Sequence, residues 1–309
     1  MNQAKVLNFF GLLLIMFGIS FAIPLFVAIF YGESLIRVFG LGMSILVLMG
    51  FLSWFFTKDN KQELSLSDGF VITVLFWIVL SVSGSIPFIL FGFGVVDSFF
   101  ESMSGITTTG ATVIAGLDDL PKSLLIYRQL LQWLGGMGLI VLAIAVMPLL
   151  GIGGGQLFKT QTPGPMSEQR LTPRITSTAR ALWSIYFVLT VLCIFAYRLA
   201  GMSYFDAVSH AFSTVSIGGF STHDLSIGFF DSLSIEIVCI TFMLLSAMSF
   251  AVHYSAIYRK QVLKYFYDPE LRFFVSLLIV ILGLVCLSLF ANDIDNPIRS
   301  GLFQTVSIL

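Results

Sequence analysis

The sequence predicts an all-α integral membrane protein made of repeated units, each a membrane span, a re-entrant helix, a glycine turn and a second span. Composition, long apolar stretches and a motif that recurs at a fixed spacing support this prediction. Of the 309 residues, 57% are hydrophobic and only 11% are charged, whereas soluble domains carry about 25% charged residues. The net charge of -1 gives no electrostatic reason to expect a nucleic-acid partner.

Seven stretches are apolar and have the ~20 residues that a membrane-spanning helix needs. They cover residues 7–30, 37–56, 69–91, 124–150, 181–201, 232–257 and 272–291. With Lys5 placed in the cytoplasm, eleven of the 16 basic residues fall in inside segments, which satisfies the positive-inside rule. The odd number of spans then places the C-terminus outside, or part-way back into the membrane.

Two segments between spans are too apolar for ordinary loops and too short to cross the membrane, which is typical of re-entrant segments. They cover residues 97–112 and 206–221. Each begins with an aspartate and reaches a glycine 13 positions later, at Gly110 and Gly219, so the two aspartates and the two glycines are separated by the same offset. Because each segment also lies between two spans, the sequence predicts one unit used twice in the same orientation.

The pattern begins a third time near the end of the sequence. Residues 303–308 (FQTVSI) match residues 212–217 (FSTVSI) at five of six positions. We therefore expect four parts: a two-span extension (1–60), a first unit (61–158), a second unit with its preceding cytoplasmic loop (159–265) and an incomplete third unit (266–309).

The glycine turns suggest a path for ions. Non-helical backbone at membrane depth persists only where it is buried in protein or lines an aqueous cavity. The run Thr107-Thr108-Thr109-Gly110 after the first short helix offers such backbone, and its carbonyl oxygens can replace the hydration shell of a cation. Glycine reaches the positive φ that lets successive carbonyls point the same way. A plain loop turn is the alternative, and the repetition disfavours it.

Two roles are open for the acidic residues of these segments. Asp97 and Asp206 stand where a helix N-cap is expected, and the C-terminal end of a helix capped there points inward and favours a cation. Together with Glu101, they could instead concentrate cations at an outer mouth.

Catalytic, cofactor and metal sites find little support. His210, His223 and His253 lack the spacing to a cysteine or carboxylate that a zinc site needs. No nucleophile elbow or pair of catalytic carboxylates is present, so we expect no enzyme. The glycines at 153–155 lack the rest of a phosphate-binding motif, so we expect no cofactor.

Arg128 and Gln132 share one face of a predicted helix. Gly135 and Gly136 follow, where a second backbone can approach closely. We interpret this region as a structural corner near the membrane surface.

The sequence resembles the Trk/Ktr/HKT potassium transporters, and most closely the bacterial Trk-type membrane subunit. The resemblance covers essentially the whole chain, including an extra pair of N-terminal spans. The stretches that carry it are 99–112 (FFESMSGITTTGAT), 127–138 (YRQLLQWLGGMG), 163–165 (PGP), 217–224 (IGGFSTHD) and 226–231 (SIGFFD).

This resemblance implies potassium-channel-like units, four around one central pore, each with a filter strand that contributes one key glycine. The first strand, within 107–112, would be Thr107, Thr108, Thr109 and Gly110; the second, within 215–220, would be Ser216, Ile217, Gly218 and Gly219. Potassium would be the transported substrate. Its contacts would be the carbonyl oxygens of Thr108, Thr109, Ile217 and Gly218.

The resemblance also implies partners and a location. Such proteins work as homodimers in the bacterial inner membrane, surrounded by lipid, with a nucleotide-binding regulatory subunit on the cytoplasmic side. The basic segments at 170–180 and 259–264 are candidate contacts for that subunit. Channel-like flow and proton- or sodium-coupled symport both remain open.

The main departure is that the sequence holds only two complete filter strands, so we expect a partial chain that does not form a selective pore alone. One alternative is a complete two-unit channel that closes its filter by dimerisation; another is a non-functional truncated homologue. A carrier with broken helices would show inverted repeats, whereas these repeats run in the same orientation.

Overall fold

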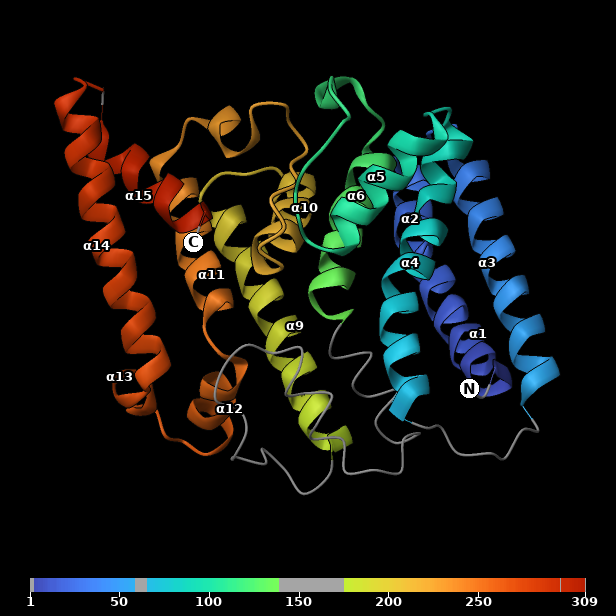
Figure 1. The fold of residues 1–309 in the computed structure, drawn as a ribbon. Coiled ribbons are helices and arrows are strands. Elements are labelled where there is room, and N and C mark those ends of the chain that lie inside the picture. Colours follow the sequence, from blue (N-terminus) through green and yellow to red (C-terminus); the bar gives the residue numbers. More distant parts are fainter. Residues whose placement is uncertain (1–2, 59–65, 139–174, 295, 309) are drawn as a thin grey trace.

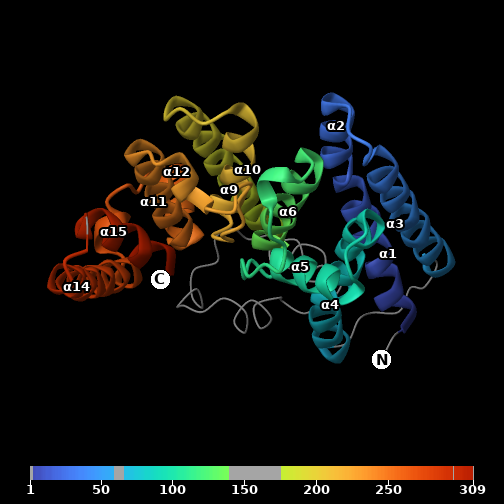
Figure 2. The same ribbon diagram turned by 90° about the horizontal axis from the view of Figure 1, so that it is seen from above.

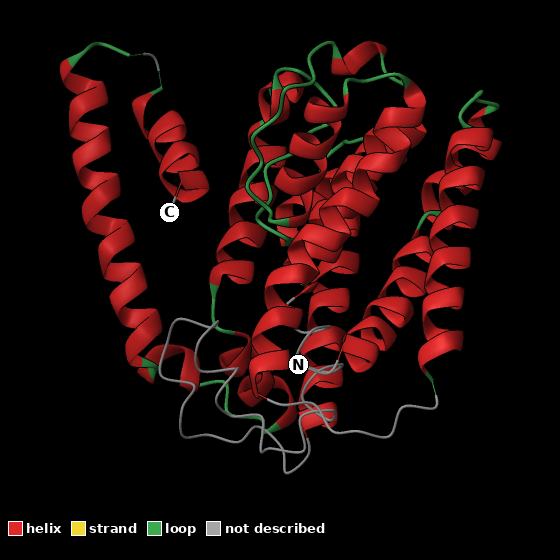
Figure 3. Cartoon of the chain, turned by 45° about the vertical axis from the view of Figure 1, so that its right-hand side comes forward, coloured by secondary structure: helices red, strands yellow, loops and turns green. Residues whose placement is uncertain are grey.

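The computed structural model describes residues 3–58, 66–138, 175–294 and 296–308, and its long helices run side by side (Figure 1). All regular structure in these residues is helical, as Figure 3 shows. The first half contains α1 (Gln3–Ser20), α2 (Ala22–Tyr31), α3 (Ile36–Thr57), α4 (Leu66–Phe91), α5 (Val95–Ile106), η1 (Leu117–Asp119) and α6 (Lys122–Gly136). The second half contains α9 (Ile175–Leu199), α10 (Tyr204–Val215), η2 (Ser226–Phe230), α11 (Leu233–Ala247), α12 (Phe250–Tyr258), α13 (Lys264–Tyr267), α14 (Pro269–Ala291) and α15 (Pro297–Ile308).

Five helical stretches among the described residues are long and apolar enough to cross a membrane. They are Gln3–Tyr31, Ile36–Thr57, Asp68–Phe91, Arg180–Leu199 and Pro269–Ala291. Each coincides with a predicted span, so the prediction of a multi-pass, all-α membrane protein is confirmed. Of the span predicted at 124–150, α6 supplies the beginning, and the rest lies outside the described residues, as do the predicted unit boundaries at 60 and 158.

The prediction of one continuous span over 232–257 is wrong. The helix breaks between α11 and α12, which meet at a bend of 94°. Met248 and Ser249 adopt extended backbone, with ψ of 145° and 122°. The break leaves carbonyls at the end of α11 without helical partners, and His253 reaches back so that its Nε2 lies 2.8 Å from the carbonyl oxygen of Leu245. No proline or glycine marks the break, so the sequence pattern did not reveal it.

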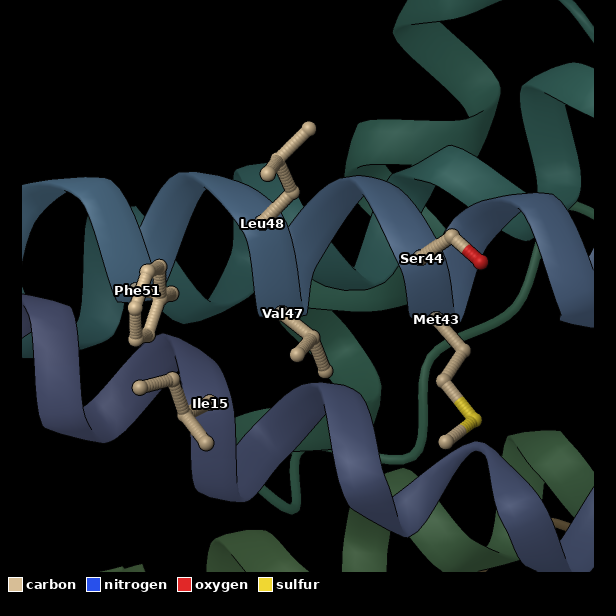
Figure 4. Close-up of a pocket in the computed structure, with 6 residues that line it drawn as sticks. All are labelled: Ile15, Met43, Ser44, Val47, Leu48 and Phe51. Carbon is tan, nitrogen blue, oxygen red and sulfur yellow. The ribbon is translucent and has the colours of Figure 1, made fainter.

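The N-terminal extension is a tight helical hairpin of α1 and α3. A Cβ added to Gly11 would lie 2.8 Å from the carbonyl oxygen of Gly50, so small residues let the two backbones approach, as is common in membranes. Farther along this hairpin, an apolar pocket of about 380 Å³ is lined by Ile15, Met43, Ser44, Val47, Leu48 and Phe51 (Figure 4). The Ser44 hydroxyl donates to Gly40 of its own helix (2.8 Å), so this pocket offers nothing to an ion.

Three short helices share one level of the molecule. Helices α5, α10 and α15 have 12 residues each and occupy the upper half of Figure 1. Helices α5 and α10 begin and end at positions related by the offset that separates Gly110 from Gly219. Helix α15 follows α14 and packs against α14 and α11. Seen from above, α6 lies between α5 and α10 (Figure 2).

Candidate functional site

The first short helix, α5, ends in a compact hydrogen-bonded turn. The backbone amide of Thr108 donates to Gly105 (3.0 Å), and the amide of Thr109 donates to Ser104 (2.9 Å). These are the two bonds of a Schellman motif, which reverses the chain at a helix C-terminus. The segment after α5 therefore leaves the helix at a defined point and direction.

The second short helix, α10, ends in the same way at the equivalent position of the repeat. The amide of Ile217 donates to Thr214 (3.1 Å), and the amide of Gly218 donates to Ser213 (2.9 Å). Each donor and acceptor is the counterpart of one in the first turn, so the repeat read from the sequence extends to individual backbone hydrogen bonds.

Backbone dihedrals repeat with the same offset. Thr108 and Ile217 have φ of 55° and 53°, and Gly110 and Gly219 have φ of 77° and 84°. Positive φ is uncommon for any side chain and strained for a β-branched one. Such strain persists where surrounding structure imposes it, and it is concentrated at functional sites.

The two turns meet at their glycines. A Cβ added to Gly110 would overlap the carbonyl oxygen of Gly218 and lie 3.6 Å from the Cα of Gly219. Gly110 is therefore required for space as well as for φ. In contrast, a Cβ on Gly219 would meet only the Cα of Gly110, at 4.0 Å.

The two strands differ in exposure. In the first, Thr107 and Thr109 are exposed, and their hydroxyl groups lie 2.8 Å apart. In the second, Ile217 and Gly219 are exposed, whereas Ser216 and Gly218 are buried. The structure thus places all eight predicted filter residues in two adjacent non-helical strands that continue from the C-terminal ends of α5 and α10.

The prediction that Asp97 and Asp206 are N-caps is wrong. Helix α5 begins after Gly94, and α10 begins after Ser203, so each aspartate is the third residue of its helix and lies in the first turn. Ser203 is the N-cap of α10: its Oγ accepts from the amide of Asp206 (3.1 Å) and donates to the carboxylate of Asp206 (2.7 Å). Two residues of the helix precede each aspartate, and an acid in the first turn suits the positive end of the helix dipole.

Glu101 is not an acid of the outer mouth, as the sequence had suggested. Its side chain is fully buried, and Oε1 lies 2.7 Å from Nη2 of Arg128, which is also fully buried. Oε2 accepts from the hydroxyl group of Thr112 (2.9 Å), just beyond the first strand. Burial of a carboxylate requires such partners, so Glu101 holds the strand and is not available to ions in solution.

Arg128 connects the two strands. Its Nη1 donates to the carbonyl oxygen of Ser221 (3.0 Å), and its Nη2 donates to the hydroxyl group of Thr112 (3.1 Å). Its guanidinium also lies 4.4 Å from the ring centre of Phe220. Arg128 is fully buried, so its contacts are made inside the protein.

Close backbone approach at the two glycines of α6 is confirmed. A Cβ on Gly135 would overlap the carbonyl oxygen of Ile106, the last residue of α5. A Cβ on Gly136 would lie 3.0 Å from Cβ of Ser216, at the end of α10. Helix α6 therefore packs against the C-terminal ends of both short helices.

The second unit has its own counterpart of the Glu101–Thr112 contact. His210 and Ser221 occupy the equivalent positions, with His210 Nε2 3.0 Å from the Ser221 hydroxyl group. His210 Nδ1 faces the carbonyl oxygen of Asp206 (3.0 Å), so Nδ1 carries the proton and Nε2 accepts from the serine. Sequence reasoning missed this pairing, although the offset between the repeats predicts it once the first contact is known.

The loops beyond the two strands are also joined. Asp224 accepts from the amides of Gly116 and Leu117 (3.1 Å each). His223 Nδ1 forms a short hydrogen bond with Asp118. These contacts link the outer loop of the first unit with that of the second.

The loop contact predicts a pH dependence. The hydrogen bond from His223 lowers the pKa of the Asp118 carboxyl below its ordinary value of 3.8. A lowered folded-state pKa stabilises the fold above the unfolded-state pKa, and this stability is lost as the pH falls through the folded value. We expect Asp118→Asn to lower the unfolding temperature slightly at neutral pH and not to lower it at pH values below the folded pKa. Thermal unfolding in detergent across this range measures the effect, with Asp119→Asn as the neighbouring control; equal curves for wild type and Asp118→Asn at neutral pH would contradict it.

The start of α6 depends on the N-terminal extension. The carboxylate of Glu33 accepts from the backbone amides of Lys122 (2.7 Å) and Ser123 (3.1 Å). It thereby satisfies two of the free amides at a helix N-terminus, a capping role that is usually local in sequence. Because Glu33 and Lys122 are far apart in the sequence, sequence reasoning had no signal for this contact.

No group of three or more histidine, cysteine, aspartate or glutamate side chains within the described residues is arranged to hold a metal ion. The polar contacts near the strands instead pair protein groups with each other. Besides the side chain of Ile217, the exposed residues along the two strands are Thr107, Thr109 and Gly219. Backbone and hydroxyl oxygen atoms such as theirs are the ligands that alkali cations use.

Comparison with known proteins agrees with this geometry. The sequence model of the TrkH family, described as cation transport protein, matches residues 35–300. The Trk system potassium uptake protein TrkH of Halomonas elongata is 46% identical over 314 residues, covering 100% of this chain and 65% of that protein. Its namesake from Vibrio parahaemolyticus is 47% identical over 318 residues, with the same coverage.

A solved structure is also similar. The crystal structure of the potassium transporter TrkH from Vibrio parahaemolyticus matches with a TM-score of 0.87 and 44% sequence identity, over 100% of this chain and 64% of that one. The chain thus spans slightly less than two thirds of the length of these relatives. Its sequence and its fold place it in the TrkH family of cation transport proteins.

Proposed function

We propose that this chain forms part of the ion pathway of a potassium uptake protein, in which its two non-helical strands line a selectivity filter. One observation carries the proposal: two strands with matching hydrogen bonds and dihedrals follow two equivalent helices and meet at Gly110 and Gly219. Two lone turns in ordinary loops have no reason to share such strained geometry. The names of the relatives, Trk system potassium uptake proteins, support potassium as the ion.

Backbone carbonyl oxygens are the proposed ion ligands. Those of Thr108 and Thr109 serve the first strand, and that of Ile217 serves the second. The carbonyl oxygen of Gly218, which the sequence had also suggested as a ligand, instead accepts from the buried side chain of Gln132 (2.6 Å). The hydroxyl groups of the exposed threonines of the first strand add a further set of oxygens. The C-terminal ends of α5 and α10 adjoin these strands, and their partial negative charge favours a cation.

The family resemblance extends the proposal to location and partners. The chain acts in the inner membrane of a bacterium, as a homodimer, with a nucleotide-binding regulatory subunit on the cytoplasmic side. Arg259 directly follows α12, and Lys264 begins α13. These two helices lie at the lower end of the molecule in Figure 1, whereas α5 and α10 lie in its upper half, so Arg259 and Lys264 are candidate contacts for that subunit. Both repeats run in the same direction, which disfavours a carrier built from inverted repeats.

Substitution of Gly110 tests the filter. In the complete protein, expressed in a bacterium that lacks potassium uptake, Gly110→Ala should reduce initial potassium uptake about tenfold or more, because the added Cβ overlaps Gly218 and strain of about 1–3 kcal/mol is typical of such sites. Gly219→Ala should have a smaller effect, since its Cβ has space.

Gly116→Ala is the matched control. Gly116 has nearly the same φ as Gly110 (74° against 77°), but no atom of the described residues lies within 4 Å of its added Cβ. Uptake is compared at equal amounts of protein in the membrane, measured by immunoblot. Equal uptake by the Gly110 and Gly116 variants would refute the filter assignment.

A further inference from the structure

Gln132 on α6 forms hydrogen bonds with the backbone of the second strand. Its side chain is fully buried, and its Nε2 donates to the carbonyl oxygen of Gly218 (2.6 Å) while its Oε1 accepts from the amide of Phe220 (3.1 Å). One carboxamide thus binds the backbone on both sides of Gly219, and we call this pair of hydrogen bonds a bracket. Both bonds are shielded from water, so their geometry is strongly favoured.

Gln132 also explains why residue 218 is glycine. A Cβ added to Gly218 would overlap the Gln132 side chain, with Oε1 at 2.5 Å and Nε2 at 2.7 Å. The φ of Gly218 is not in the left-handed range, so the backbone itself does not require glycine. Glycine is required at position 218 because a larger residue would occupy the space of the Gln132 carboxamide.

Among the described residues, no side chain forms an equivalent bracket at the first strand. Thr109 stands at the position that corresponds to Gly218, and its hydroxyl group pairs with Thr107. The residue that corresponds to Gln132 in the second unit is Thr241, which is exposed and donates to Ile237 of its own helix (2.7 Å). Among the described residues, a carboxamide therefore holds the second strand, which is the strand that α6 reaches.

Gln132 belongs to a row of contacts along α6. Four residues before it, Arg128 binds Ser221 beyond the same strand, and Gly135 and Gly136 pack against the ends of the two short helices. This spacing places the contacts on one helix face. The rigid helix thus fixes the second strand at three successive levels.

We propose that Gln132 is a positioning residue that determines cation selectivity by holding the carbonyl oxygen of Gly218 and the amide of Phe220 in place. The proposal rests on the proposed function. Without the carboxamide, the peptide bond after Gly218 loses its partner and can rotate, which changes the number and direction of carbonyl dipoles that an ion meets. Selectivity depends on that number and field strength, so it should fall more than the rate of flux.

The test uses the complete protein in liposomes, with potassium and sodium fluxes measured separately. Gln132→Leu removes both hydrogen bonds at similar side-chain size. We expect its potassium-to-sodium flux ratio to fall about tenfold or more relative to wild type, equivalent to about 1.4 kcal/mol.

Gln129→Leu is the matched control. Gln129 lies on the same helix and is equally buried, but its amide atoms have no hydrogen-bond partner among the described residues. Its replacement should leave the ratio unchanged. A ratio for Gln132→Leu equal to that for Gln129→Leu would overturn the positioning role.

A second pair of variants separates hydrogen bonding from packing. Gly218→Ala should be poorly expressed because of the overlap with Gln132, and adding Gln132→Ala should restore expression because the overlapping atoms are removed. The double variant should still show the reduced flux ratio, since the bracket is absent. Restored expression with a wild-type ratio would reduce Gln132 to a packing role and refute the proposal.

Failure of the proposed function looks different. If liposomes that contain the wild-type protein carry neither potassium nor sodium, while liposomes with a known channel do, both the ion pathway and the inference are refuted. Wild-type flux that is potassium-selective, with all variants equally selective, would refute the inference alone. Should Gln132→Leu not reach the membrane, the double variant supplies the same comparison.

Discussion

Glu101→Gln is expected to lower the free energy of unfolding by about 3–5 kcal/mol, because it removes the charge that compensates a buried arginine. Arg128 is fully buried, and Glu101 is the carboxylate in contact with it. Glutamine retains the shape and one acceptor oxygen, so the loss reflects charge and not packing. Because Arg128 also binds Thr112 and Ser221, transport should fall together with stability.

The measurement is thermal and denaturant unfolding of the detergent-solubilised protein. Asp231→Asn is the matched control: it removes a carboxylate from Arg299, but Asp231 is 90% exposed, and exposed ion pairs contribute little. We expect no measurable loss there. A double variant, Glu101→Gln with Arg128→Gln, should regain part of the stability, and a double variant with strictly additive losses would show that the pair is not coupled.

Gly135→Ala is expected to destabilise the protein by about 1–3 kcal/mol or more, the usual effect of overpacking a well-packed core. The added Cβ would overlap the carbonyl oxygen of Ile106 and lie 2.9 Å from its Cα. These are backbone atoms at the end of α5, so no side-chain rotation relieves the overlap. Helix α6 must move away, and the strand contacts that it carries must move with it.

Gly283→Ala, in the exposed helix α14, is the control for Gly135→Ala. In the part of the chain that the structure describes, no atom lies within 4 Å of its added Cβ, and alanine in a helix is favoured over glycine by about 0.5–1 kcal/mol. We expect unchanged or slightly higher stability. Unfolding temperature and the amount of folded protein in the membrane measure both effects; a Gly135 variant as stable as the Gly283 variant would contradict the close approach described above.

Local sequence patterns sufficed for much of the fold. Runs of apolar residues predicted the spans, because a helix that crosses lipid must be apolar along about 20 residues. The offset between Gly110 and Gly219 predicted equivalent short helices, and α5 and α10 share that offset at both ends. The break at Met248 escaped prediction, since neither proline nor glycine occurs there.

The contacts around the strands depended on residues that are distant in sequence. The charge of Glu101 suggested that its side chain is exposed, but Arg128 lies beside it in the structure. No residue close to Gln132 in the sequence indicated that its side chain contacts Gly218. Glu33 caps a helix that begins far along the chain, at Lys122. A polar side chain is expected to face solvent only when the protein offers it no hydrogen-bonding or charged partner. Here the partners lie on helices that are distant in sequence and are brought close by packing.

The sequence by itself determined the membrane class, the repeat and the two glycine turns, because each depends on composition or spacing along the chain. The resemblance to a transporter family also came from the sequence, through the particular stretches that carry it. Only the tertiary structure decided which polar groups face the strands and which hold them. Hydrogen bonds and ion pairs between distant residues require three-dimensional placement: helix α6 lies between the two short helices, and its position converts an arginine and a glutamine into the supports of two strands.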